Sequence, residues 1–318
     1  MTVTITAGIT FSGGGLTMSF APPSTNTAGW VAGGYNGTSV VSSIQRITFA
    51  TDTATASLRG VLSQNTSSAA GTGNFTNGWF GSTTSSTTVQ RITYATDTAT
   101  ASVRGPLSLA RGQYGATGTT TDGWFAGGQA YPQVSTVDRI TFATDTATAS
   151  VRGPLSLAKR GLAASSDGTT YGWFGGGYGG FPMTTIVDRI TYATDTNTAS
   201  ARGPLNTGTY FTSGTGNTTN GWIIGGYDAT NNPSSTIQRI TYANDLVTAS
   251  VRGPLPNNVI MSGAAMTDAN YGWNGGGYLG GERSNVNRIT YATDTATATG
   301  RGPLAAAGRY FAATSGSQ

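Results

Sequence analysis

Residues 138–155 read Asp-Arg-Ile-Thr-Phe-Ala-Thr-Asp-Thr-Ala-Thr-Ala-Ser-Val-Arg-Gly-Pro-Leu, and this stretch occurs six times, with small changes, in a chain of 318 residues. Its first arginine returns after 45, 48, 50, 50 and 49 residues, at Arg46, Arg91, Arg139, Arg189, Arg239 and Arg288. Every tryptophan follows a glycine once per repeat, at Trp30, Trp79, Trp124, Trp173, Trp222 and Trp273. A repeat of this length, built from short strands, is typical of the blades of a β-propeller.

Each repeat contains four segments with the character of a β-strand. In the fourth repeat these are the small residues 161–167, the Trp-containing residues 171–177, the β-branched residues 185–193 and residues 196–202 before Gly-Pro. We expect the small first segment to lie innermost, where the strands of a propeller converge on a narrow channel. An Asp begins the turn between the third and fourth segments in every copy, and an Asp there favours an Asx turn. These residues are Asp52, Asp97, Asp145, Asp195, Asp245 and Asp294.

The two ends of the chain predict a closed ring. After the last Arg-Gly-Pro-Leu at 301–304, residues 305–318 supply only a first strand, whereas the chain near Trp30 begins at a second strand. If the tail pairs with the strand at Trp30, the ring has no open sheet edge. The sequence therefore predicts an all-β protein, with a six-bladed propeller over residues 27–318 closed by the C-terminal strand and an N-terminal β extension over residues 1–26.

The composition excludes several kinds of chemistry. The chain has no cysteine and no histidine, a single lysine and a single glutamate, and only 9% charged residues. Disulfides, thiolate or imidazole metal ligands and histidine bases are therefore absent. Each repeated turn offers one carboxylate, whereas a calcium ion takes six to eight oxygen ligands. We expect no metal, no cofactor and, since no apolar run reaches about 18 residues, no membrane insertion.

The net charge of +4 arises mainly from the repeat. Of the 17 basic and 13 acidic residues, twelve arginines and six aspartates belong to the repeated framework and are spread evenly around the ring. Nucleic-acid binding favours basic residues clustered on one face, so we do not expect a nucleic-acid partner. The repeated arginines are expected to pair with the turn aspartates or with carbonyl groups at the blade edges.

The repeats differ most in the loop between the second and third strands. These loops share one face of a propeller with the connectors between blades, which carry Arg111, Arg160 and Arg309. Loops on a rigid scaffold are common recognition sites, and exposed aromatic residues and arginines suit sugar stacking or protein contacts. The alternative is that these differences are tolerated surface variation. The candidate ligand- or receptor-binding residues are Tyr131, Tyr178, Phe181, Tyr227, Tyr278 and Arg283.

Residues 1–26 lie outside the repeat. Apolar residues alternate with polar or small ones before and after a Gly-Gly-Gly segment, which predicts a hairpin or two short strands ending at Pro22-Pro23. A lone hairpin is only marginally stable in water, so its apolar face needs a partner. That partner is either the chain's own propeller or another protein, to which the extension would add strands. The candidate docking residues are Val3, Ile5, Ile9, Leu16, Met18 and Phe20.

The repeat resembles two known groups of proteins over about residues 27 to 318. Its order of small strand, Gly-Gly, Tyr, aliphatic strand, Asp-Thr turn, Arg and Pro-Leu resembles kelch repeats, although the kelch tryptophan near the fourth strand is replaced by Ala or Ser. The run Asp-Arg-Ile-Thr-Tyr-Ala-Thr-Asp is similar to repeats in virion-associated proteins of tailed bacteriophages. The N-terminal Met-Thr-Val-Thr-Ile-Thr also resembles the start of such proteins.

The phage resemblance implies a non-enzymatic structural protein of the virion, a tail fibre or another component displayed in multiple copies on the particle. The propeller would recognise a glycan or protein of the host surface, and the N-terminal segment would attach to other virion proteins. One alternative is a capsid decoration or a purely structural component without a receptor. The other is a carbohydrate-active enzyme, because two carboxylates can hydrolyse a glycoside. Outside the repeated framework its candidate acids are Asp122, Asp167, Asp228 and Asp268.

Overall fold

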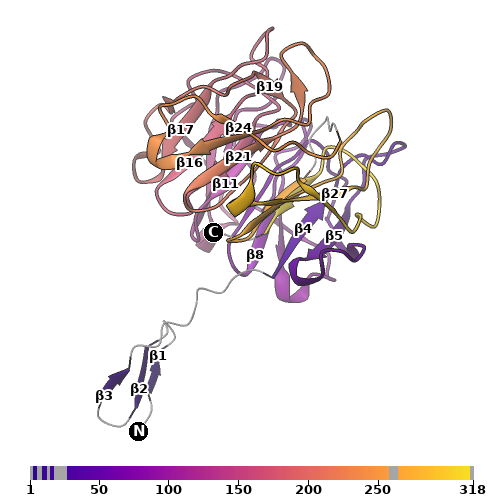
Figure 1. Ribbon diagram of the computed structural model, residues 1–318. Coiled ribbons are helices and arrows are strands. Elements are labelled where there is room, and N and C mark those ends of the chain that lie inside the picture. The colour runs from indigo at the N-terminus through magenta and orange to yellow at the C-terminus, as the bar shows by residue number, and fades with distance from the viewer. Residues whose placement is uncertain (1–2, 6–8, 13–14, 18–26, 258–263, 316–318) are drawn as a thin grey trace.

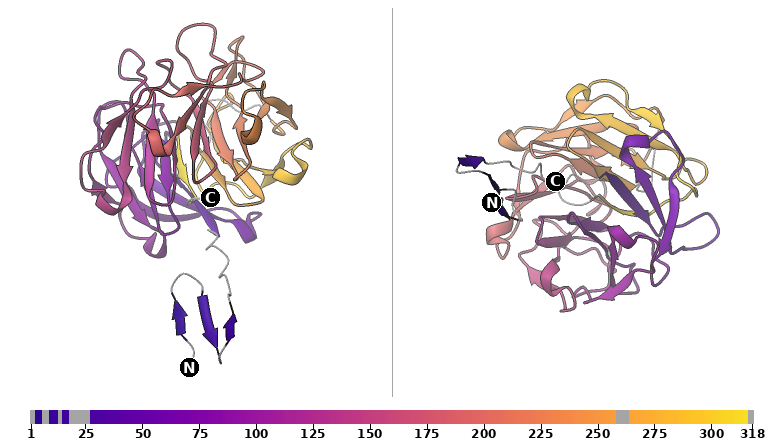
Figure 2. Two further views of the ribbon diagram at one scale, coloured as in Figure 1. Left: turned by 90° about the vertical axis from the view of Figure 1, so that its left-hand side faces the viewer. Right: turned by 90° about the horizontal axis from the view of Figure 1, so that it is seen from below.

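The computed structural model describes residues 3–5, 9–12, 15–17, 27–257 and 264–315, with side chains from residue 27 onward. The described residues from 27 to 315 form six four-stranded antiparallel sheets arranged in a ring (Figures 1 and 2). This confirms the predicted six-bladed β-propeller. In every blade the small first strand lines the central channel and the fourth strand lies at the rim.

The first three blades share one order of strands from the channel outward. Blade 1 contains β29 (Ala312–Thr314), β4 (Ala28–Ala32), β5 (Ser43–Thr48) and β6 (Ser57–Val61). Blade 2 contains β7 (Gly71–Gly73), β8 (Asn77–Phe80), β9 (Val89–Thr93) and β10 (Ser102–Arg104). Blade 3 contains β11 (Gly115–Gly118), β12 (Asp122–Ala126), β13 (Val137–Thr141) and β14 (Ser150–Arg152).

The second half of the ring has the same order. Blade 4 contains β15 (Ala163–Ser166), β16 (Tyr171–Gly175), β17 (Val187–Thr191) and β18 (Ser200–Ala201). Blade 5 contains β20 (Ser213–Gly216), β21 (Asn220–Ile224), β23 (Ile237–Thr241) and β24 (Ser250–Arg252). Blade 6 contains β25 (Ala264–Thr267), β26 (Tyr271–Gly275), β27 (Val286–Thr290) and β28 (Thr299–Arg301). A short extra pair, β19 (Thr209–Tyr210) and β22 (Tyr227–Asp228), lies in the loops of blade 5.

The predicted closure of the ring by the C-terminal strand is confirmed. Strand β29 pairs with β4 in antiparallel register, so that Thr314 lies opposite Trp30 and Ala312 opposite Ala32. The first and last parts of the chain therefore share blade 1, and Figure 2 shows the yellow C-terminal segment beside the indigo first strands of the ring.

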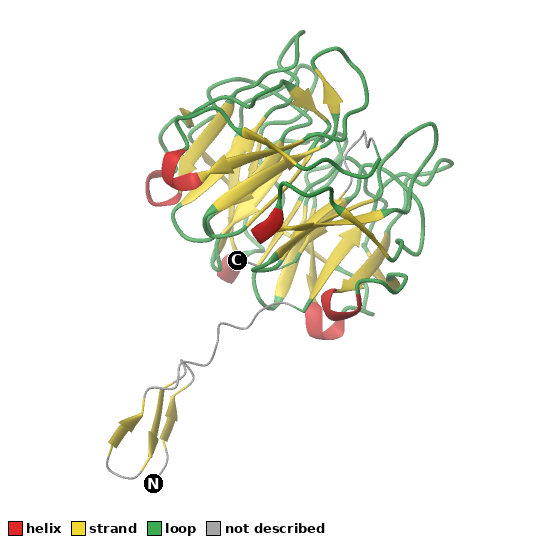
Figure 3. Cartoon of the chain, viewed as in Figure 1, coloured by secondary structure: helices red, strands yellow, loops and turns green. Residues whose placement is uncertain are grey.

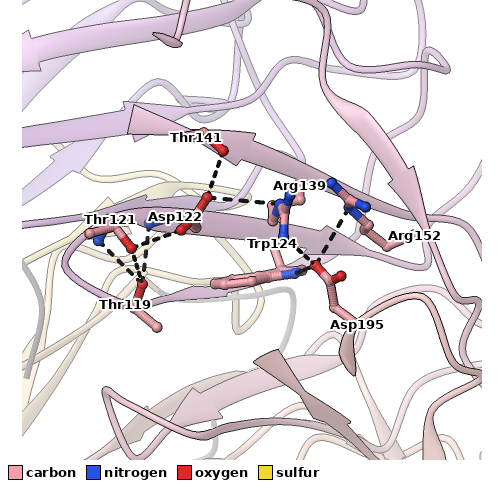
Figure 4. Close-up of polar contacts among 8 residues, drawn as sticks. All are labelled: Thr119, Thr121, Asp122, Trp124, Arg139, Thr141, Arg152 and Asp195. Atoms are coloured by element: carbon pink, nitrogen blue, oxygen red, sulfur yellow. Dashed lines mark hydrogen bonds and ion pairs between the residues drawn. The ribbon is translucent and has the colours of Figure 1, made fainter. Parts of the chain in front are cut away.

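The turn aspartate of each blade binds three side chains of the preceding blade. In blade 4, Asp195 Oδ2 accepts hydrogen bonds from Trp124 Nε1 at 2.8 Å and from Arg139 Nη1 at 3.1 Å (Figure 4). The Nε atom of Arg152 lies 3.5 Å from the same oxygen. The contact repeats at every blade boundary, with the Trp–Asp distance between 2.8 and 2.9 Å. The prediction that the repeated arginines pair with turn aspartates is therefore confirmed.

The predicted Asx turn at these six aspartates is wrong. Each aspartate follows a short 3-10 turn, and its side-chain hydrogen bonds go to the neighbouring blade. The 3-10 turns are η1 (Phe49–Thr51), η2 (Tyr94–Thr96), η3 (Phe142–Thr144), η4 (Tyr192–Thr194), η5 (Tyr242–Asn244) and η6 (Tyr291–Thr293). Asx turns occur instead between the first and second strands, where Asp167 Oδ1 accepts from the N–H groups of Thr169, Thr170 and Tyr171 at 2.8 to 3.0 Å.

Aromatic stacking joins the same blade boundaries. Each tryptophan ring lies parallel to the first residue of the next 3-10 turn, as in the pair Trp173 and Tyr242, whose centroids are 3.8 Å apart. The last such pair, Trp273 with Phe49, closes the ring. The tryptophans are at most 4% exposed. Stacked pairs of this kind add about 0.5–1.5 kcal/mol each beyond the burial of their surface.

A glycine permits the close approach of neighbouring blades. Gly153, in the Arg-Gly-Pro segment of blade 3, donates to the carbonyl of Asp195 at 2.8 Å. A Cβ atom at this position would overlap the carbonyl oxygen of Asn197 in the next turn. The five equivalent glycines have the same surroundings. The repeated Arg-Gly is therefore a requirement of blade packing.

The ring has two different faces. The turn face carries the 3-10 turns, drawn as red helices in Figure 3, and the loop face carries the loops between second and third strands together with the blade connectors. Because Ala28 pairs with Thr48 and Thr314 with Trp30, the chain enters β4 and leaves β29 on the turn face. The N-terminal entry and the loop face are on opposite sides of the ring.

The N-terminal extension forms a sheet of three strands, whereas the sequence predicts a hairpin or two short strands. Strand β2 (Ile9–Ser12) pairs with both β1 (Val3–Ile5) and β3 (Gly15–Thr17), and Figure 1 shows this sheet apart from the propeller. The candidate docking residues Val3, Ile5, Ile9 and Leu16 lie on these strands. Met18 and Phe20 lie outside the described residues.

Candidate functional site

The contacts between blades leave few charged side chains for function. All twelve repeated arginines and all six turn aspartates take part in the boundary contacts. The remaining basic residues are Arg111, Lys159, Arg160, Arg283 and Arg309. These five residues lie on the connectors and loops of the loop face.

Two of these cations are structural. Arg111 Nη1 lies 2.7 Å from Asp138 Oδ2, and Lys159 Nζ lies 3.0 Å from Asp188 Oδ2, with all four side chains fully buried. Arg111 also donates to the carbonyls of Phe125 and Gly127. Burial lowers the pKa of Lys159, and the nearby Asp188 opposes that effect. The expectation that Arg111 belongs to an exposed recognition face is therefore wrong.

The buried ion pairs occur in the copies of the repeat that have an aspartate where blade 2 has a glutamine. Blades 3 and 4 have Asp138 and Asp188 on the third strand, and among the described connector residues only those of these two blades supply a buried cation. Blade 2 has Gln90 at that position, and its Nε2 donates to Thr66 Oγ1 at 3.1 Å. The carboxylate and its cation thus replace a neutral hydrogen-bonded pair.

The aspartates considered for an enzyme lie at separate places, at strand ends or in turns. Asp122, Asp167 and Asp268 lie on the turn face in blades 3, 4 and 6, whereas Asp228 lies in a loop of blade 5 on the loop face. Asp228 and Asp268 accept hydrogen bonds from backbone N–H groups of their own turns. The structure does not bring these four carboxylates together.

Half-buried tyrosines gather on the loop face beside two arginines. We call this group the aromatic crown; its members are Tyr35, Tyr178, Tyr210, Tyr227, Tyr278 and Tyr310 with Arg160 and Arg309. The tyrosines come from the loops of blades 4, 5, 6 and 1 and from the connectors before blades 5 and 1. Blades 2 and 3 have Thr83 and Gln129 where the other blades have a tyrosine after Gly-Gly or its equivalent. On the loop face the crown therefore covers blades 4, 5, 6 and 1 and not blades 2 and 3.

Backbone pairing positions the crown. Among the described connectors, three supply a residue that pairs with the tyrosine after Gly-Gly: Arg160 with Tyr178, Tyr210 with Tyr227 and Arg309 with Tyr35. Residues opposite each other in an antiparallel pair have neighbouring side chains. The glycines before each tyrosine, such as Gly176 and Gly177, have positive φ angles of 67° and 104°, which turn the chain toward the connector.

The crown side chains form a connected arc. Arg160 lies over the Tyr178 ring, with its Cζ 5.2 Å from the centroid, and Tyr210 lies 5.9 Å from Tyr178 and 5.2 Å from Tyr227. Phe211 contacts both Tyr210 and Tyr310 beneath the arc. On the other side, Arg309 lies over Tyr278 at 4.6 Å and over Tyr35 at 5.1 Å. Glu282 Oε1 lies 3.7 Å from Arg309 Nε.

Two hydroxyl groups of the crown, those of Tyr210 and Tyr310, have a raised pKa. Burial raises the pKa of Tyr210, and the neighbouring Tyr227 raises it further. Burial also raises the pKa of Tyr310, and the charge of Arg309 opposes that effect. Like ordinary tyrosine hydroxyls, both are protonated at neutral pH and can donate hydrogen bonds, and the raised pKa extends this state to more alkaline pH.

The structure divides the predicted binding residues into two groups. Tyr178, Tyr227 and Tyr278 belong to the crown. Tyr131 and Phe181 lie at loop tips, 80% and 72% exposed. Arg283 is exposed, and its Nη2 donates to the carbonyl of Leu279.

Sequence reasoning missed Tyr210, Tyr310 and Phe211 as part of this site. They occupy the connector immediately before the innermost strand, the position that Arg160 and Gly161 hold in blade 4. Aligning the connectors with one another would have indicated them.

The central channel is too narrow to be the main binding site. Its two parts have volumes of about 90 and 100 Å³ and are lined mostly by Gly, Ala, Ser and Thr of the innermost strands. At the loop face a series of backbone hydrogen bonds narrows the mouth: Ser68 donates to Tyr310, Gln113 to Ser68 and Gly161 to Gln113. A ligand of the loop face would therefore contact the crown from outside.

Comparison with family models and with curated protein sequences yields no match. The described residues include no helix with the length and hydrophobicity of a membrane span. In the same residues, no three acidic side chains converge in a way that could hold a metal ion.

Proposed function

We propose that this protein is a non-enzymatic structural component of a bacteriophage virion that uses its propeller to recognise the host surface. The observation that carries the proposal is the polarity of the ring. The chain enters from its N-terminal sheet on the turn face, and the asymmetric crown of tyrosines and arginines is on the loop face. An attached N-terminus on one side leaves the crown exposed on the other.

The distribution of charge supports recognition rather than catalysis. The repeated charges are used between blades, and the remaining aspartates lie in buried pairs or at separate strand ends and turns. The crown offers aromatic faces, hydroxyl groups and guanidinium groups, which are the groups that bind carbohydrates and protein surfaces. The kelch-like order of the repeat and its similarity to phage virion repeats support the same proposal.

The N-terminal sheet is the proposed attachment site. Strands β1 and β3 are the edges of a three-stranded sheet, and edges can pair with a strand of another protein. Deleting residues 1–26 leaves the closing pair of β29 and β4 intact, so the variant should fold. It should no longer be incorporated into particles. Normal incorporation would contradict the proposed attachment.

Host recognition is tested by competition. The purified full chain should block adsorption of the virus to its host, and a Tyr178→Ala/Tyr227→Ala variant should block it less well. The matched control is Tyr94→Phe, which removes a tyrosine hydroxyl at a blade boundary and leaves the crown intact. If the wild-type chain does not compete, a decoration or purely structural role is favoured instead.

A further inference from the structure

Ion pairing distinguishes two arginines from the other cations. Among the described residues, which include all 17 basic side chains, every lysine and arginine has a carboxylate partner except Arg160 and Arg283. Both are on the loop face. Arg160 lies over the Tyr178 ring of the crown, whereas Arg283 lies outside the crown, so Arg160 is the unpaired cation that an anionic ligand of the crown would meet.

Arg160 is held in place without being neutralised. Its Nη1 donates to Gln113 Oε1 at 2.9 Å, its guanidinium lies over Tyr178, and its backbone exchanges two hydrogen bonds with Tyr178. No described residue accepts a hydrogen bond from its Nη2. A guanidinium whose position is already set loses little further freedom when it binds a carboxylate.

The rings beside Arg160 form a row. Tyr178, Tyr210 and Tyr227 follow one another, and the last two are stacked at 21° to each other. Such half-buried rings expose apolar surface with polar hydroxyls at its edge. Sugar rings combine apolar faces with hydroxyl groups and match this surface.

A nucleic-acid ligand fits the same face less well. Its affinity depends on many phosphate contacts, each made by a basic residue. The loop face has two cations without a carboxylate partner, and Asp228 and Glu282 add negative charge to the same face. A ligand with isolated negative charges separated by sugar rings suits this arrangement better.

We propose that Arg160, Tyr178 and Tyr210 form a subsite for an acidic sugar residue, whose carboxylate binds Arg160 and whose ring stacks on the tyrosines. The inference deepens the proposed function, on which it rests for the biological source of the ligand, a carboxylated polysaccharide of the host surface. Gln113 is a positioning residue that orients the guanidinium.

The test uses the full-length protein and two matched ligands. Oligogalacturonate carries one carboxylate per sugar, and its methyl ester has the same backbone without the charge. Calorimetry should show binding of the acid and at least about tenfold weaker binding of the ester. Arg160→Gln should bind the acid at least about tenfold more weakly than the wild type and should bind the ester as the wild type does.

Arg283→Gln is the matched control, because it removes an equally unpaired arginine from the same face away from the tyrosine row. It should retain binding to within about a factor of two to three. Arg160→Lys should give an intermediate affinity, because a lysine keeps the charge and loses the planar fork. Equal binding of acid and ester, or equal losses in Arg160→Gln and Arg283→Gln, would overturn the subsite.

The two proposals fail separately. If the protein blocks adsorption to the host but Arg160→Gln blocks equally well and no oligogalacturonate binds, the acidic-sugar subsite is wrong and host recognition stands. If the protein binds oligogalacturonate through Arg160 but does not compete for adsorption, the subsite stands and the proposed function is wrong.

Discussion

The indole Nε1 of Trp273 in blade 6 donates a hydrogen bond of 2.9 Å to Asp52 Oδ2 in blade 1, across 221 residues of sequence. Arg288 Nη1 lies 3.1 Å from the same oxygen, and Arg301 Nε lies 3.4 Å from it. The seam where the ring closes thus has the same contact as the five boundaries between consecutive repeats. The same set of contacts holds all six boundaries together, and the seam needs no closing element beyond the pairing of β29 with β4.

Asp52→Asn should destabilise the protein by about 2–3 kcal/mol, because two arginines and an indole N–H lose a charged acceptor. The arginines are partly exposed, which limits the loss. Asp268→Asn is the matched control, since its role is to accept backbone N–H groups and Asn74 and Asn217 do this in other blades. Its effect should stay within about 0.5 kcal/mol. Urea unfolding measures both, and equal effects would contradict the boundary contact.

Gly153→Ala should destabilise the protein by about 1–3 kcal/mol, because the added Cβ would overlap the carbonyl of Asn197. Gly300 is the control: it lies on β28, has no atom within 4 Å of its ideal Cβ position, and corresponds to Val151 in blade 3. Gly300→Val should leave stability unchanged or raise it by up to about 1 kcal/mol, because valine favours strands. A loss from Gly300→Val as large as that from Gly153→Ala would contradict this explanation.

The ring could be predicted from the sequence because each strand is marked by residues within its own short segment. Strand character, the missing first strand near Trp30 and the surplus one after Leu304 could all be read directly. The partner of the turn aspartate could not be read in this way. In blade 4 the indole that binds Asp195 lies 71 residues earlier, and nothing beside the turn indicates it.

The candidate site was predicted only in part, for a similar reason. Arg111 and Arg160 both precede an innermost strand, but Arg160 is one position nearer to the strand. That offset places Arg111 in a buried pair and Arg160 in the crown. The sequence did contain a signal for the buried pairs, because Asp138 and Asp188 replace glutamine only in the two repeats with Arg111 and Lys159.

Stability should fall at alkaline pH. Burial raises the pKa of Tyr192 and of Tyr291 far above the ordinary value of 10.0. Below pH 10 these tyrosines are protonated in both the folded and the unfolded protein, and their contribution to the free energy of unfolding is fully present. As the pH rises further that contribution is lost, because only the unfolded protein releases the proton. Each such tyrosine should lower the free energy of unfolding by about 1.4 kcal/mol per pH unit above pH 10.

In Tyr192→Phe the free energy of unfolding should fall less steeply above pH 10, by about 1.4 kcal/mol per pH unit, because one titrating tyrosine is removed. Phenylalanine occupies the same position in blade 3, as Phe142 stacked on Trp79, so the variant should fold. It should cost about 1 kcal/mol at pH 8, because the hydroxyl is hydrogen-bonded to Ser166 and Thr117. Urea unfolding between pH 8 and about pH 11.5 measures both effects, and an unchanged alkaline slope would contradict the prediction.

The buried pair of Arg111 and Asp138 should be replaceable by the neutral pair of blade 2. Arg111→Thr alone leaves the Asp138 carboxylate buried without its cation and should cost about 3–5 kcal/mol. The double variant Arg111→Thr/Asp138→Gln reproduces Thr66 and Gln90, whose side chains hydrogen-bond at 3.1 Å, and should regain most of that loss. A double-mutant cycle by urea unfolding should give a coupling energy of at least about 2 kcal/mol. Additive effects would show that the two side chains are independent, and a loss of oligogalacturonate binding in the folded double variant would show that this pair also supports the crown.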